Sequence, residues 1–152
     1  MTDTTPETAE GLEFTYSRDF DAPRDLMFRV FMEPEHFVKF WGPHGVHTPI
    51  ESVVIEPRVG GRFESTMVAD DGSGEFPVHA HFVAHQPPES FTFRIDASGV
   101  ESTTTFEDLG GGRTRMTIHQ RNLTPEFVTE ESQAGFATSI DKYEAYLATL
   151  TA

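Results

Sequence analysis

Between residues 46 and 122, apolar and polar residues alternate with a period of two. This alternation is typical of β-strands that bury one face. Short runs rich in glycine, proline and aspartate interrupt it, and connections this short join antiparallel neighbours. The sequence therefore predicts an antiparallel meander with one apolar face and one polar face. The expected strands are residues 47–56, 61–69, 75–85, 90–96, 100–108 and 113–121.

Further elements flank this meander. Residues 12–20 alternate like another strand, and residues 21–32 and 34–41 have the apolar spacing of two short helices. Residues 123–150 predict a long helix, with Thr124 as its cap. An α+β fold, in which the curved sheet wraps around this helix, buries both apolar surfaces. The apolar stripe of the long helix comprises Phe136, Ile140, Tyr143, Leu147 and Leu150.

A single domain accounts for this pattern. The chain has 152 residues, a length typical of one domain with a sizeable core. Residues 1–11 are polar and rich in threonine and glutamate, and we expect them to be a disordered tail. The domain is expected to span residues 12–152.

Charge and composition exclude several classes of function. A formal net charge of −14 opposes binding to nucleic acid, because phosphates would be repelled. No apolar run approaches the roughly 20 residues that span a bilayer, so we expect no membrane insertion. The chain has no cysteine, which excludes disulfides and thiol catalysis. The start of the sequence lacks the apolar core of a signal peptide, and the expected location is the cytoplasm.

Five segments in order carry a resemblance to a known family. They are "DAPRDLMFRVFMEPEHFVKFWGPHG", "EPRVGGRFE", "QPPESFTF", "TTTFEDLGGGRTRMTIHQ" and "GFATSIDKYEAYL". Together they resemble the START/SRPBCC superfamily, and within it the Aha-type group named after the heat-shock-protein ATPase activator. The resemblance covers roughly residues 12–150 and implies a helix-grip fold.

The resemblance implies a range of functions. The superfamily includes lipid carriers, ligand binders, aromatase/cyclases and antibiotic self-resistance proteins, and the Aha-type group has no shared catalytic motif. A chaperone partner is one implication. However, the full co-chaperone has a separate amino-terminal domain, and a chain of this length does not hold one, which argues against that partner.

Three histidines on the strand at residues 75–85 raise the question of a metal site. His79, His81 and His85 alternate along the strand and share one face, as metal ligands on a strand can. The opposite face carries Phe76 and Phe82, which look like core residues. The histidines are therefore predicted to point to solvent, and we expect neither a metal nor a cofactor.

Three further histidines surround the stretch "FWGPHG", which contains the only tryptophan, Trp41. His36, His44 and His47 have acidic residues near them in sequence, as catalytic histidines need. Bracing of a loop is the simpler interpretation, since no nucleophile motif accompanies them. A cyclase or hydrolase that uses His44 and His47 remains the enzymatic alternative.

The apolar interior is the strongest candidate for a site. It is either a solid core or a pocket for an apolar or aromatic molecule, with polar anchors such as Tyr143 or Gln120. Trp41 is predicted to pack at one end of the interior, as part of its entrance. The candidate cavity residues are Trp41, Phe63, Met67, Phe76, Phe93, Phe106, Met116, Ile118, Phe136, Ile140 and Tyr143.

The leading hypothesis is non-enzymatic binding of a hydrophobic small molecule between the sheet and the long helix. A co-chaperone-like module for protein interaction is the alternative, and it predicts an exposed patch instead of a cavity. Exposed edges of a sheet often pair, which allows a homodimer.

Overall fold

The computed structural model describes residues 12–151 and is built around one antiparallel sheet. The sheet has eight strands in the order β1-β8-β7-β6-β5-β4-β2, and β3 also pairs with β4. This arrangement confirms the predicted antiparallel meander, with the first strand added beside the last. The strands are β1 (Leu12–Phe20), β2 (Val46–His47), β3 (Val54–Ile55), β4 (Arg62–Ala69), β5 (Glu75–Gln86), β6 (Ser90–Ile95), β7 (Glu101–Gly110) and β8 (Arg113–Leu123).

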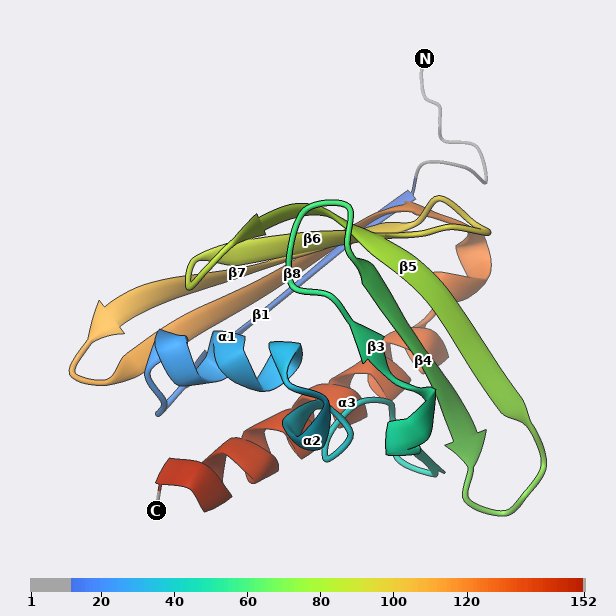
Figure 1. Cartoon of the computed structure of the whole chain (residues 1–152), viewed down its shortest axis with the longest axis horizontal. Helices are drawn as coiled ribbons and strands as arrows, with labels where there is room; N and C mark the ends of the chain where they lie inside the picture. Colours follow the sequence, from blue (N-terminus) through green and yellow to red (C-terminus); the bar gives the residue numbers. More distant parts are fainter. Residues whose placement is uncertain (1–11, 152) are drawn as a thin grey trace.

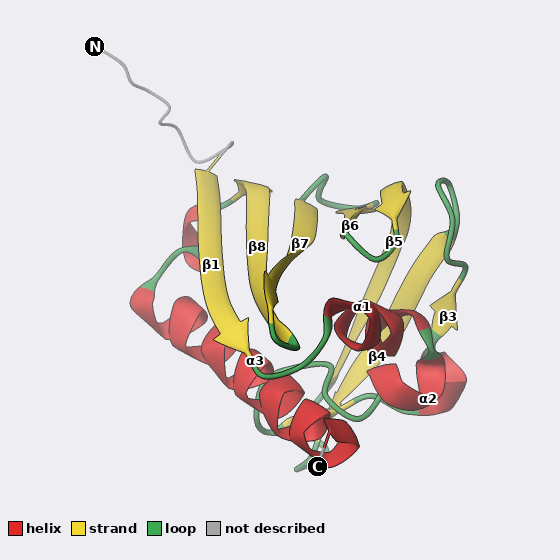
Figure 2. Ribbon diagram, turned by 90° about the vertical axis from the view of Figure 1, so that its left-hand side faces the viewer, coloured by secondary structure: helices red, strands yellow, loops and turns green. Residues whose placement is uncertain are grey.

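All helices lie on the concave side of the curved sheet (Figure 1). The long helix α3 (Glu130–Thr151) runs beneath the sheet, and the short helices α1 (Arg24–Met32) and α2 (Pro34–Phe37) lie beside it. Helix α1 packs against β7, and α2 follows it on the same side of the sheet (Figure 2). The α+β helix-grip architecture predicted from the sequence is therefore confirmed. None of the helices in residues 12–151 is both long enough and apolar enough to cross a membrane. The predicted disordered tail, residues 1–11, lies outside the described part of the chain.

Two local predictions were too long. The strand expected at residues 47–56 is divided into β2 and β3, because a 3-10 helix, η2 (Ile50–Ser52), follows Pro49 and interrupts the pairing with β4. The helix expected at residues 34–41 ends at Phe37. Beyond it the chain tightens into turns, in which the Lys39 amide donates to the His36 carbonyl only three residues back.

The long helix begins later than predicted. Thr124 precedes a short 3-10 helix, η3 (Pro125–Phe127), and its side chain caps nothing. The α-helix starts at Glu130, where the backbone N–H of Ser132 donates to the Thr129 hydroxyl at 3.1 Å. Thr129 therefore performs the capping that the sequence assigned to Thr124.

A β-bulge at Val83 reverses the faces of β5. Phe82 is opposite Phe93, but Ala84 is opposite Thr92 and His85 is opposite Phe91, which leaves Val83 as one extra residue. His85 therefore turns to the concave face and does not share a face with His79 and His81. The prediction that all three point to solvent is wrong for His85, whose ring packs against Phe28 at 5.4 Å between centroids.

Aromatic side chains fill the space between the sheet and the helices. Phe31 of α1 lies 4.9 Å from Tyr143 of α3 and 5.3 Å from Phe91 of β6, measured between ring centroids. Tyr143 is 1% exposed, and its hydroxyl donates to the Met27 carbonyl of α1 at 2.9 Å. One tyrosine thus joins α3 to α1 by both packing and a hydrogen bond.

We predict that Tyr143→Phe lowers the free energy of unfolding at neutral pH by about 0.5–1.5 kcal/mol, the net value of one hydrogen bond. Burial raises the pKa of Tyr143 well above its ordinary value of 10.0, so the folded state retains a proton that the unfolded chain releases in alkali. The contribution of Tyr143 to the free energy of unfolding is complete at pH values below the pKa of this tyrosine in the unfolded chain. It falls as the pH rises through that pKa. Urea denaturation at neutral and alkaline pH should therefore show the gap between the two proteins narrowing in alkali. A gap that stays constant with pH would contradict this role for Tyr143.

Candidate functional site

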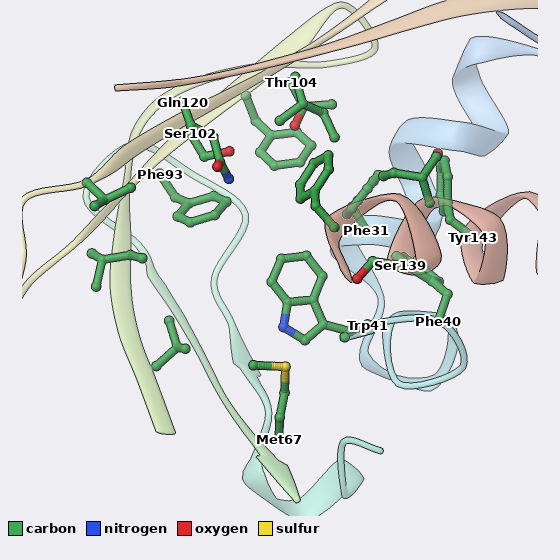
Figure 3. Close-up of a pocket in the computed structure, with 18 residues that line it drawn as sticks. Phe31, Phe40, Trp41, Met67, Phe93, Ser102, Thr104, Gln120, Ser139 and Tyr143 are labelled. Atoms are coloured by element: carbon green, nitrogen blue, oxygen red, sulfur yellow. The ribbon is translucent and has the colours of Figure 1, made fainter. Parts of the chain in front are cut away.

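A cavity of about 210 Å³ lies between the sheet and α3, at the end where Trp41 projects inward (Figure 3). Its walls come from β4 to β8, from α1 and α3, and from the chain that follows α2. Most of the lining is apolar and aromatic. The lining residues are Phe31, Phe40, Trp41, Gly42, Met67, Val78, Phe91, Phe93, Ile95, Val100, Ser102, Thr104, Ile118, Gln120, Phe136, Ser139, Ile140 and Tyr143.

The candidate residues from the sequence divide into three groups. Those that line the cavity are Trp41, Met67, Phe93, Ile118, Phe136, Ile140 and Tyr143. Phe63, Phe106 and Met116 are buried in the neighbouring core and do not line it. Phe76 is 48% exposed, so the prediction that it is a core residue is wrong. It is the second residue of β5, beside the turn of the β4–β5 hairpin, and this hairpin extends beyond the helices (Figure 1).

Trp41 forms one wall of the cavity. Its ring stacks on Phe37, with centroids 4.6 Å apart, and meets Phe63 edge-on at 5.8 Å. The indole Nε1 is buried and has no hydrogen-bond partner among the described residues. An unpaired buried donor of this kind is destabilising by about 1–3 kcal/mol. The side chain of Trp41 is half-buried, and its ring packs against two phenylalanines.

The loop after Trp41 closes tightly against the cavity. Gly42 has a φ of +102°, and a Cβ at this position would lie 2.7 Å from Val46 Cγ2 and 3.0 Å from Met67 Sδ. Only glycine fits both the backbone angle and the space. The turn at Gly42 therefore sets the direction in which the chain leaves the cavity wall and approaches β2.

The same loop is tied to α3 by hydrogen bonds. Nζ of Lys142 donates to the carbonyls of Pro43 and Val46, at 3.3 and 3.4 Å. The backbone N–H of His44 donates to the hydroxyl of Thr138 at 3.2 Å. Burial lowers the pKa of Lys142, which is consistent with an ammonium group that faces backbone carbonyls instead of bulk water.

Three polar side chains interrupt the apolar face of the sheet within the cavity. Ser102 and Thr104 of β7 are each 3% exposed, and Gln120 of β8 is directly opposite Ser102. We call Ser102, Thr104 and Gln120 the polar patch; Figure 3 shows the side chains of Ser102 and Gln120 side by side. None of the three side chains hydrogen-bonds to another residue within the described chain. Tyr143, the other anchor suggested by the sequence, is already engaged with Met27.

Sequence reasoning found Gln120 but missed Ser102 and Thr104. The signal was present, because alternation placed Thr103 and Thr105 on the polar face of β7, which turns the even-numbered residues inward with Phe106. Serine and threonine are also found on the inward faces of strands that have no binding role. For this reason the pattern did not mark them as part of a site.

No residue that lines the cavity carries a formal charge at neutral pH. The loop histidines lie elsewhere: His47 contacts Asp70 at 2.6 Å on the surface, and His36 contacts the Tyr146 hydroxyl at 2.6 Å. His44 is exposed. Within residues 12–151 no group of three or more acidic or histidine side chains is placed to hold a metal ion.

A shallow groove on the outside is lined by α1 residues, His85 and the turn after β5. Burial lowers the pKa of His85 and so favours the neutral form of its ring, and its Nε2 has no partner in the described part of the protein. The groove is open to solvent and is separate from the cavity beneath the sheet.

An antiparallel sheet that curves around a long carboxyl-terminal helix, with a cavity between them, defines a helix-grip domain of the START/SRPBCC superfamily. Residues 21–148 match the family described as "Activator of Hsp90 ATPase homolog 1-like protein", and the chain belongs to this family. A search of curated proteins finds no match.

Solved structures of similar fold come from several bacteria. An AHSA1-like protein from Aeromonas hydrophila superposes with a TM-score of 0.79 at 20% identity, covering 92% of this chain and 94% of that one. A protein from Nitrosomonas europaea gives a TM-score of 0.78 at 21% identity, covering 92% and 96%. An AHSA1 protein from Silicibacter pomeroyi gives 0.75 at 21% identity, covering 91% and 99%. These structural similarities support the assignment of the fold.

We predict that Lys142→Met loosens the loop over the cavity. Methionine keeps an apolar stem of similar length but removes the donors to Pro43 and Val46. Amide hydrogen exchange of residues 42–46 should then accelerate, while exchange in the strands stays unchanged. Lys39→Met is the matched control, because Lys39 is exposed and is the only other lysine. Equal exchange of the loop in both variants would show that Lys142 does not hold it.

Proposed function

We propose that this protein binds a small hydrophobic or aromatic molecule, without chemical conversion, in the cavity between the sheet and α3. The observation that carries the proposal is a cavity of about 210 Å³ with a mainly aromatic and aliphatic lining. Apolar cavities of roughly 150 Å³ already accept benzene. The volume therefore suits one substituted ring or two small fused rings.

The chemistry of the lining supports binding more than catalysis. A general acid or base needs a titratable group within reach of the substrate. The lining residues include no histidine, carboxylate, lysine or cysteine. The Tyr143 hydroxyl points away to Met27, and burial raises its pKa. Nothing in this lining favours the alternative of a cyclase or hydrolase that acts through His44 and His47, which lie outside it.

The distribution of exposed apolar residues bears on the co-chaperone alternative. A docking surface of that type would gather large apolar side chains into one patch. Among the described residues, each exposed large apolar side chain belongs to a different element of the fold, so no single element presents a row of them. They are Ile50 in η2, Val59 in the loop before β4, Phe76 in β5 and Leu150 in α3.

We predict that alkylbenzenes such as propylbenzene raise the melting temperature and change the fluorescence of Trp41. A ligand that binds only the folded state stabilises it by RT ln(1 + [L]/Kd), so the melting temperature rises with the logarithm of ligand concentration once the site is saturated. Trp41 is the only tryptophan and lines the cavity, so its emission reports occupancy directly.

Val78→Phe provides the specificity test. Val78 lines the cavity, and a phenyl group there occupies the space of the ligand, so affinity should fall by roughly tenfold or more. Val68→Phe is the matched control, because Val68 lies on β4 outside the lining. Unchanged binding by Val78→Phe, or no response of wild type to any apolar probe, would refute the proposed site.

A further inference from the structure

We propose that the cavity selects neutral molecules with one hydrogen-bonding group, which is held by the polar patch while the apolar part lies against Trp41 and α3. The inference rests on the proposed function and adds the chemistry and orientation of the ligand. It depends on three observations: the place of the polar patch, its lack of partners, and the absence of charge in the lining.

The polar patch lies on an otherwise apolar surface. Ser102 and Gln120 are opposite each other on β7 and β8, and the next inward pair on the same strands is Thr104 and Ile118. Phe106 and Met116 follow, and both are almost completely buried. Polar residues thus occupy only one end of the concave face of these two strands, where the cavity reaches the sheet.

The polar patch has unused hydrogen-bonding capacity. A serine hydroxyl both donates and accepts, and a glutamine amide offers donors and an acceptor. Ser102 is 3% exposed, and its hydroxyl makes no hydrogen bond to another residue within residues 12–151. The indole Nε1 of Trp41 is a second unpaired donor in the same lining. An unpaired polar group in a desolvated site is destabilising. A hydroxyl or carbonyl of a ligand would supply that partner, and Ser102 with Gln120 can match either group.

The lining disfavours ions of both signs. It contains no charged side chain, so an ionised ligand would lose its hydration without gaining a counter-charge. The net charge of −14 further opposes the approach of anions. A neutral ligand avoids both costs.

The opposite walls determine the orientation. Trp41 projects into the cavity from the side of α2, and Phe40 and Tyr143 lie near α3, away from Ser102 and Gln120 (Figure 3). The hydroxyl of Ser139 is the polar group on this side of the lining. Aromatic rings are matched by an apolar or aromatic group. The ligand therefore directs its polar group to β7 and β8 and its ring to the helices.

Three probes with one shared skeleton test this inference: propylbenzene, para-propylphenol and para-propylbenzoate. Calorimetry near neutral pH compares an apolar, a neutral polar and an anionic molecule of similar size. We expect the phenol to bind about three- to tenfold more tightly than propylbenzene, the net effect of one hydrogen bond. The benzoate should bind most weakly.

A triple variant, Ser102→Ala with Thr104→Val and Gln120→Met, removes all three hydrogen-bonding side chains of the polar patch and keeps the approximate volume. It should reduce the affinity for the phenol to that for propylbenzene, while propylbenzene binds as well as before. Binding of propylbenzene also shows that the variant is folded. Thr105→Ala, an exposed position on the other face of β7, is the matched control and should keep the preference for the phenol.

The outcomes separate the two proposals. Three outcomes would overturn the polar-patch inference and leave the binding function intact. They are equal affinity for the phenol and propylbenzene, tightest binding of the benzoate, and a preference for the phenol that survives in the triple variant. Failure of all three probes to bind wild type would overturn the proposed function itself, and this inference with it.

Discussion

The packing of aromatic side chains between the sheet and the helices is the interaction on which the rest of the structure depends. Phe31 contacts Tyr143, Phe91 and Phe40 within 4.9–5.3 Å between ring centroids, so one residue of α1 joins α3, β6 and the segment after α2. Each such pair adds to the stability gained by removing the rings from water. Because α1 and α2 are short, this packing holds them in place more than their own backbone hydrogen bonds do.

The cavity follows from how this aromatic packing is distributed. Phe28, Phe82, Phe91 and Phe106 fill the space beneath the middle of the sheet and are almost fully buried. Toward β4 and the start of β5 the side chains that line the interior include Met67 and Val78, which are only partly buried. Trp41 and Gly42, at the start of the loop that follows α2, form part of the wall here. The space that remains is bounded by tightly packed groups, which favours a defined shape over a collapsible one.

The sequence predicted the fold far better than the details of the site. Alternation at Phe91, Phe93 and Phe106 correctly marked buried strand faces, because a period of two depends only on backbone geometry. It failed at His85, where an unpaired residue reverses the faces, and at Phe76, where the strand continues beyond the helix layer. Both errors concern tertiary arrangement, which local patterns do not encode. The unpaired state of Ser102 likewise depends on what lies across the cavity and not on its neighbours in sequence.

The extra residue at Val83 has a consequence for comparison between relatives. Before Val83, even-numbered residues of β5 such as Phe82 face the interior. After Val83, an odd-numbered residue, His85, faces the interior. At about 20% identity, an alignment that misplaces a single gap in this strand would equate inward residues with outward ones for the rest of β5. Roles can therefore be transferred across this strand only between family members that share the same bulge.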